Sequence, residues 1–144
     1  MTEPIFVDSN ILLYAIDKAD PSKQKAARNW QNVLWKCRLG RLSFQVLSEF
    51  YVNAVRIRSN ASEEAREEIR DLLAWEPVAI DAALLELGWK IQDRYRISFW
   101  DSLIVAASKT ASCRYLLTED LQAGQDFDGV KVLNPFLTDP GMLV

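Results

Sequence analysis

A short apolar run near the amino terminus constrains the fold more than any other stretch of the chain. Residues 4–7 are Pro-Ile-Phe-Val, and the run breaks off at Asp8, Ser9 and Asn10. An apolar run this short, bounded by proline and by polar residues, is typical of a parallel strand covered on both faces. Ligands of open α/β sheets collect beyond the carboxyl ends of the strands, so Asp8 lies where chemistry is expected. The alternative is that Asp8 or Ser9 only caps the helix expected from 11–15.

A second run with the same organisation occurs towards the carboxyl end. Residues 114–118 predict a strand that ends in Thr118, Glu119 and Asp120. Alternation along an extended chain points Thr118 and Asp120 to one side and Glu119 to the other. We therefore take Asp120 as the functional acid, with Glu119 left as the alternative. A role for Asp120 in a turn or an N-cap is the competing interpretation.

The chain contains 144 residues, of which 49% are hydrophobic, and it has no histidine. This length and apolar content predict one compact domain over 1–144, with a C-terminal tail from about 135. The lack of histidine excludes Ser-His-Asp and Cys-His catalysis and histidine-ligated zinc. Cys37 and Cys113 make no metal-ligand spacing, and we expect both to be reduced. Since no segment predicts a membrane helix or a signal peptide, we expect a soluble, cytoplasmic protein.

The charge balance does not by itself indicate a nucleic-acid-binding protein. The chain has 17 basic and 20 acidic residues, which gives a net charge of −3, whereas such proteins usually carry a basic excess. An acidic metal site inside a basic rim would give the same small negative sum. Charge therefore leaves this question open.

Helical periodicity predicts the secondary structure of most of the remaining chain. We expect helices at 22–39, 44–58, 63–75 and 82–95, the last capped by Asp81, a turn at 59–62, and strands at 41–43, 78–80 and 130–133. Gly40 should end the first helix, with Cys37 on its buried face. Residues from 134 onward are expected to form a surface tail. We assign Trp30, Trp35 and Trp89 to core packing ahead of an interaction surface.

Glu49 lies in the predicted helix at 44–58. One polar stripe of this helix contains Gln45, Glu49, Asn53 and Arg56, spaced so that they face the same way. The stripe could face an acidic cavity shared with the strand ends. A solvent-facing Glu49 is the plainer interpretation.

Asp101 lies in the first turn of a predicted helix that is apolar almost all round. Ser98 and Asp101 approximate a capping box, and a carboxylate at this position complements the helix dipole. A capping role and a functional role are compatible, because a helix N-terminus favours the ionised form that binds a cation.

Four segments in this order form a recognisable set. They are Phe-Val-Asp8-Ser-Asn10, Ser-Glu49-Phe with Arg56 following, Trp-Asp101-Ser-Leu-Ile-Val-Ala-Ala, and Leu-Leu-Thr118-Glu-Asp120. Together they resemble the PIN-domain nucleases, in particular the small VapC-type toxins of bacterial and archaeal toxin-antitoxin pairs. The resemblance spans residues 5–136. It implies an α/β fold, a three-layer α/β/α sandwich with a central, mainly parallel sheet.

The resemblance implies that Asp8, Glu49 and Asp101 hold a metal ion, with Asp120 as the more variable fourth acid. Physical chemistry agrees, because carboxylates that converge repel one another unless a cation neutralises them. Oxygen ligands without histidine or cysteine suit Mg²⁺ or Mn²⁺. Such ions bind phosphate oxygens and stabilise the charge that develops in phosphodiester hydrolysis.

The resemblance also implies supporting residues and partners. Asn10 and Thr118 would orient the acids through hydrogen bonds, and Arg56 would contact either a substrate phosphate or one of the acids. The implied activity is that of an endoribonuclease acting on RNA. The implied partners are a cognate antitoxin and a second copy of the chain in a homodimer.

Two other functions compete with this one. A phosphatase of the haloacid dehalogenase type needs a second aspartate two residues after Asp8, and Asn10 occupies that place, which counts heavily against it. A non-catalytic PIN-like module that binds RNA or protein stays open, although the presence of all four acids disfavours it. No motif indicates which RNA is cleaved, because that choice depends on the shape of surface loops.

Overall fold

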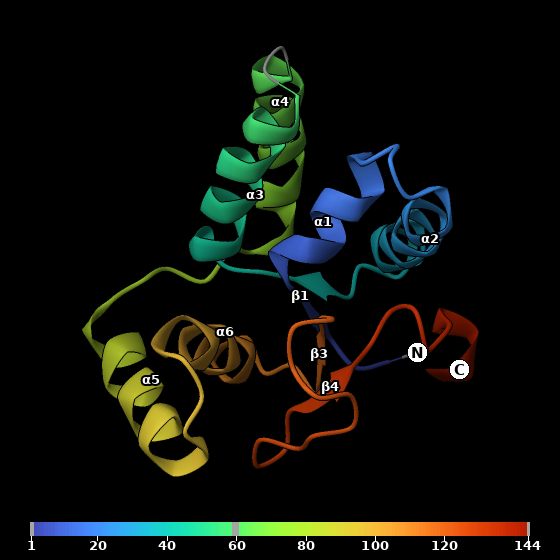
Figure 1. Cartoon of the computed structure of the whole chain (residues 1–144). Coiled ribbons are helices and arrows are strands. Elements are labelled where there is room, and N and C mark those ends of the chain that lie inside the picture. Colours follow the sequence, from blue (N-terminus) through green and yellow to red (C-terminus); the bar gives the residue numbers. More distant parts are fainter. Residues whose placement is uncertain (1, 59–60, 144) are drawn as a thin grey trace.

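The computed structural model describes residues 2–58 and 61–143 (Figure 1). The described strands are β1 (Ile5–Val7), β2 (Gly40–Arg41), β3 (Tyr115–Leu117) and β4 (Lys131–Leu133). The described α-helices are α1 (Ser9–Ile16), α2 (Pro21–Cys37), α3 (Phe44–Ile57), α4 (Ser62–Leu72), α5 (Ala82–Tyr95) and α6 (Phe99–Thr110). Two 3₁₀ helices, η1 (Leu73–Trp75) and η2 (Pro140–Leu143), complete the set.

The four strands form one parallel sheet in the order β2-β1-β3-β4. All three residues of β1 are buried, which confirms the prediction of a covered parallel strand. The chain passes from β1 to β2 on one side and later crosses to β3 on the other side of β1. The carboxyl ends of β1 and β3 therefore flank the switch point, where open α/β sheets bind their ligands.

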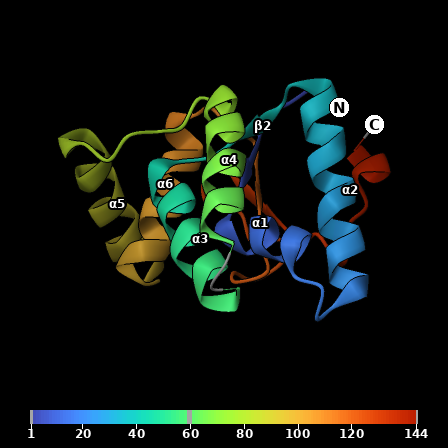
Figure 2. The ribbon, with the colours of Figure 1, turned by 90° about the horizontal axis from the view of Figure 1, so that it is seen from above.

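Helices lie on both sides of this sheet. Figure 1 shows α1 to α4 above the strands, with α3 and α4 as an upright pair, and α5 and α6 packed together at the lower left. Seen from above in Figure 2, α5 and α2 lie at opposite ends of the molecule. This arrangement confirms the predicted α/β class with a central parallel sheet.

Side-chain caps explain where most of the helices begin. The side chains that accept a hydrogen bond from a backbone N–H of the first turn are those of Asp8 (α1), Asp20 (α2), Ser43 (α3), Asp81 (α5) and Ser98 (α6). Each satisfies a donor that the helix itself leaves unpaired. The capping roles predicted for Asp8, Asp81 and Ser98 are thus confirmed.

Several predicted boundaries in the middle of the chain are wrong. Gly40 begins β2 instead of only ending a helix, and the strand expected at 78–80 is reduced to a single bridge between Ser43 and Val78. Pro77 lacks an N–H, and residues 79–80 are exposed, so only Val78 joins the sheet edge. The helix expected over 63–75 becomes 3₁₀ at its end. The turn expected at 59–62 lies partly outside the described residues.

The carboxyl-terminal segment packs against α2, so the surface tail predicted from residue 134 is wrong. The indole N–H of Trp30, which is fully buried, donates to the carbonyl oxygens of Pro135 at 3.3 Å and Thr138 at 3.0 Å. Pro135 and Pro140 are themselves buried. Trp30 is therefore both a core residue and an anchor for this segment, because a buried indole N–H needs a partner.

Three residues assigned to the core lie at the surface. Trp35 is 37% exposed and packs on Trp75 at 5.1 Å between ring centroids, and Trp89 is 46% exposed. Cys37 is also exposed, at the end of α2. In the described ranges no helix has the length and apolar character needed to cross a membrane.

Candidate active site

The ends of β1 and β3 bring Asp8 and Thr118 together. The Asp8 backbone N–H donates to Leu117 O at 3.1 Å, which continues the strand pairing by one residue. The Asp8 carboxylate accepts hydrogen bonds from Thr118 Oγ1 at 2.9 Å and from the Ser9 N–H at 2.7 Å. Asp8 therefore caps α1 and at the same time faces the end of β3.

Asn10 connects the same residues to Asp120. Its Nδ2 lies 3.1 Å from Thr118 Oγ1, 3.0 Å from Asp120 Oδ2 and 3.4 Å from Asp8 Oδ2. Its Oδ1 is buried and accepts no hydrogen bond from the described part of the chain. A buried acceptor without a donor is rare in folded proteins. This oxygen marks a place where a further polar or charged group would be stabilised.

Glu49 comes from α3 and is held by two neighbours. Ser9 Oγ donates to Glu49 Oε2 at 2.9 Å, and Gln45 Nε2 donates to Glu49 Oε1 at 3.1 Å. The Asn53 side chain donates instead to the Glu49 backbone oxygen at 2.9 Å. Of the predicted polar stripe, only Gln45 thus reaches the carboxylate. Ser9 was not predicted as a site residue, because nothing in its sequence position indicates a contact with a residue 40 positions away.

Asp101 lies in the first turn of α6, and its N–H donates to Ser98 Oγ at 3.1 Å. The same Gln45 Nε2 that bonds Glu49 also donates to the backbone oxygen of Trp100 at 3.3 Å. Gln45 therefore joins the beginnings of α3 and α6. This bridge brings Asp101 into the neighbourhood of Glu49.

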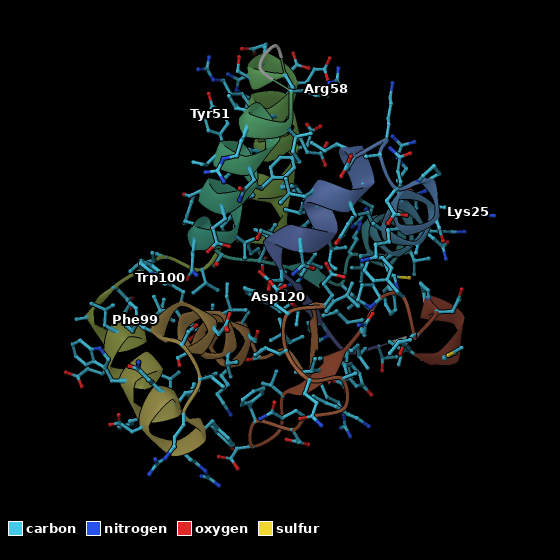
Figure 3. The ribbon with its side chains drawn as sticks, in the orientation of Figure 1. Lys25, Tyr51, Arg58, Phe99, Trp100 and Asp120 are labelled. Atoms are coloured by element: carbon cyan, nitrogen blue, oxygen red, sulfur yellow. The ribbon has the colours of Figure 1, made fainter. Side chains whose placement is uncertain are left out.

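The charges of Glu49 and Asp120 act on both Asp8 and Asp101. The pKa of Asp8 is raised to about 7, chiefly by burial; the hydrogen bonds from Thr118 and Ser9 lower it, and the charges of Asp120 and Glu49 add to the rise. The pKa of Asp101 is also raised, mainly by burial and then by Asp120 and Glu49. Figure 3 shows Asp120 beneath the start of α1, between the upper and lower groups of helices.

None of these four carboxylates forms an ion pair with a lysine or arginine in residues 2–58 and 61–143. Nor do any three His, Cys, Asp or Glu side chains of those ranges lie close enough, as they stand, to hold a metal ion. Asp8, Glu49 and Asp120 accept hydrogen bonds from neighbouring hydroxyl and amide groups instead. The site is thus an acidic cluster with no positive partner from the described chain.

Glu119 points away from this cluster. Its carboxylate accepts a hydrogen bond from the Tyr14 hydroxyl and pairs with Lys23 Nζ at 3.0 Å. Asp120, the next residue, faces Asn10. Strand alternation therefore assigned the two acids to the correct sides.

Arg56 does not join the acids. It is exposed, two turns beyond Glu49 on α3, and it makes no hydrogen bond or ion pair with the four carboxylates in the described structure. A hollow of about 670 Å³ along α2, beside Lys25 and Arg28, includes none of the acids either. The acidic cluster, at the carboxyl ends of β1 and β3, is therefore separate from this hollow.

Comparisons with known proteins agree with this geometry. The family model of the PIN domain matches residues 5–127. No curated protein matches the chain in sequence. The chain is similar in structure to a toxin-antitoxin complex from Klebsiella pneumoniae, with a TM-score of 0.65, 18% identity, and coverage of 91% of this chain and 97% of that one.

Two further solved structures are similar. One is described as FitAB bound to an IR36 DNA fragment, with a TM-score of 0.71, 20% identity, and coverage of 92% of this chain and 95% of that one. The other is Mycobacterium tuberculosis VapC20, described as a toxin that cleaves the sarcin-ricin loop, with a TM-score of 0.62, 21% identity, and coverage of 78% and 86%. At these identities the likeness establishes the fold.

Proposed function

Because the chain belongs to the PIN domain family, we propose that it is a metal-dependent endoribonuclease that hydrolyses phosphodiester bonds of RNA. The observation that carries this proposal is the acidic cluster. Asp8 and Asp101 are each affected by the charges of Glu49 and Asp120, and no basic side chain of the described residues pairs with any of them. Carboxylates held together in this way are stabilised by a bound cation.

The donors of the cluster suit Mg²⁺ or Mn²⁺. Asp8, Glu49 and Asp101 would hold the ion, and Asp120 would complete the set. These donors are all carboxylate oxygens, which hard cations prefer, and the unsatisfied Oδ1 of Asn10 adds another oxygen close by. When bound, the ion supplies positive charge that binds phosphate oxygens and makes water more acidic.

The chain's own residues have separate tasks in this proposal. Thr118 and Ser9 donate to Asp8 and Glu49 respectively and so orient two of the acids. Asn10 donates to the exposed Asp120, which in this scheme helps to position the attacking water. Arg56 makes no ion pair with the acids in the described structure, and in this scheme it contacts the substrate phosphates.

We further propose that the protein is the toxin of a toxin-antitoxin pair in the cytoplasm. Support comes from the descriptions of similar structures, which name a toxin-antitoxin complex and a toxin. A cognate antitoxin would then be its partner, and the chain would form a homodimer. Exposed apolar residues on α3, such as Val52 and Ile57, could be buried in such a protein interface.

An RNA cleavage assay tests the central proposal. Purified protein is incubated with end-labelled RNA, structured and unstructured, in Mn²⁺ or in EDTA. Asp8→Asn serves as the site variant, and Asp93→Asn, at an exposed aspartate of α5, as the matched control. We expect cleavage by the wild type and the control, a loss of about 100-fold or more in Asp8→Asn, and none in EDTA.

Equal cleavage by Asp8→Asn, or cleavage that persists in EDTA, would contradict the proposal. The alternative function is a non-catalytic PIN-like module that binds RNA or protein. Metal-independent RNA binding without cleavage, unchanged by Asp8→Asn, would favour that alternative.

A further inference from the structure

Trp100 is unusually exposed for a tryptophan. It is 60% exposed, and it immediately precedes Asp101 in the first turn of α6. Its indole offers a large, flat apolar surface on which a ligand can pack. Its place in the chain links this surface to the acidic cluster.

The backbone of Trp100 is tied to that cluster by one side chain. Gln45 Nε2 donates both to Glu49 Oε1 at 3.1 Å and to Trp100 O at 3.3 Å. In Figure 3, Trp100 lies below the N-terminal end of α3. Asp120 lies beneath the start of α1, and both residues are at the level between the upper and lower helices. The backbone of Trp100 is therefore linked through Gln45 to Glu49, and its side chain precedes that of Asp101 in the chain.

The indole is also held in place on one side. Its ring contacts that of Phe99 edge-on, with 5.3 Å between the centroids, and Phe99 in turn packs against the hydrophobic core. An aromatic side chain that is already positioned loses little conformational entropy when a ligand stacks on it. Trp100 thus combines a free surface with a supported orientation.

We propose that Trp100 is a stacking platform for an unpaired nucleobase of the RNA substrate, next to the phosphate that the acidic cluster acts on. Every base has a flat π-face, and stacking on aromatic side chains is the usual way in which proteins bind single-stranded RNA. A base inside a continuous duplex is covered on both faces by its neighbours. The substrate at this site is accordingly single-stranded RNA or a loop. This inference rests on the proposed ribonuclease activity.

The test compares KM and kcat for cleavage of an unstructured RNA in Mn²⁺ by the wild type, Trp100→Ala and Trp100→Phe. The matched control is Trp35→Ala, at another exposed tryptophan, which lies close to Arg38 and Gly40 at the amino edge of the sheet. We expect Trp100→Ala to raise KM about tenfold, the effect of losing one base stack, with kcat little changed. Trp100→Phe should recover most of the loss, and Trp35→Ala should match the wild type.

An RNA with a single abasic position provides a second measurement. A series of substrates carries the abasic position at successive nucleotides. For the wild type, KM should rise when the abasic position is at one nucleotide near the cut. For Trp100→Ala, the same substrate should not raise KM further, because both changes remove the same stack. If Trp100→Ala cleaves RNA with an unchanged KM, the inference about stacking is overturned and the ribonuclease proposal stands. The exposed indole would then be assigned to contact with a protein partner. An equal loss in Trp35→Ala would also overturn the inference about stacking. Failure of the wild type to cleave any RNA would refute the ribonuclease proposal itself.

Discussion

The buried carboxyl of Asp8 makes the stability of the metal-free protein depend on pH. Asp8 is 5% exposed, and burial raises its pKa from 3.8 to about 7. Between these two values the folded protein keeps a proton that the unfolded chain has lost. Unfolding then releases a proton, so the free energy of unfolding falls as the pH rises. The effect begins near the lower pKa and is complete above the upper one.

The size of the effect follows from the shift. About three pKa units at roughly 1.4 kcal/mol each amount to about 4 kcal/mol, a large part of the stability of a domain of this size. The side-chain amide introduced by Asp8→Asn would still accept the hydrogen bond from the Ser9 N–H but could not ionise. We therefore expect the variant to be more stable than the wild type at pH 8 by up to about 4 kcal/mol, and the two to be similar at pH 4.

Urea unfolding in EDTA at several pH values between 4 and 8 measures this difference. Other carboxylates titrate in the same range, so the quantity to plot is the wild-type stability minus that of Asp8→Asn. The control Asp93→Asn, at an exposed site, should follow the wild type throughout. A difference between wild type and Asp8→Asn that stays constant from pH 4 to pH 8 would refute the reasoning. Mg²⁺ added at pH 8 should stabilise the wild type and much less the variant.

Three more predictions follow from single contacts. The affinity for Mg²⁺ should fall about tenfold per pH unit below pH 7, because Asp8 must lose a proton to bind it, and calorimetry showing a flat profile would exclude Asp8 as a ligand. Gly40→Ala should lower the free energy of unfolding by about 1–3 kcal/mol, since the new Cβ would lie 2.7 Å from ring atoms of the buried Trp75; an unchanged urea midpoint would count against this packing. Ser9→Ala should reduce RNA cleavage about tenfold by releasing the Glu49 carboxylate, and full activity would show that this bond is dispensable.

The positions of several acids at the ends of strands and helices could be predicted from the sequence because the signals are local. Asp8 and the Thr118–Asp120 segment each follow a short apolar run, and the polar residue after a buried parallel strand must emerge at the carboxyl edge of the sheet. Asp101 follows a capping serine at helical spacing. The absence of histidine restricts the metal that we propose to ions that accept oxygen ligands. These features depend on residues only a few positions apart.

Other features were decided by packing between distant segments. Ser9 holds Glu49 across 40 positions, and Trp30 anchors the carboxyl-terminal segment across more than 100. The exposure of Trp35 and Trp89, for which we predicted core positions, depends on which helices cover which faces. Periodicity defines an apolar face of a helix but not the partner that covers it.

The sequence by itself determined the order of the acids and the class of the fold. Only the tertiary structure decided that Lys23 is the partner of Glu119 and Asn10 that of Asp120, and that Gln45 links Glu49 to the backbone beside Asp101. The physical reason is that strand periodicity and helix caps are set by neighbouring residues. Contacts between remote side chains depend on the register and packing of whole elements, which no local pattern encodes.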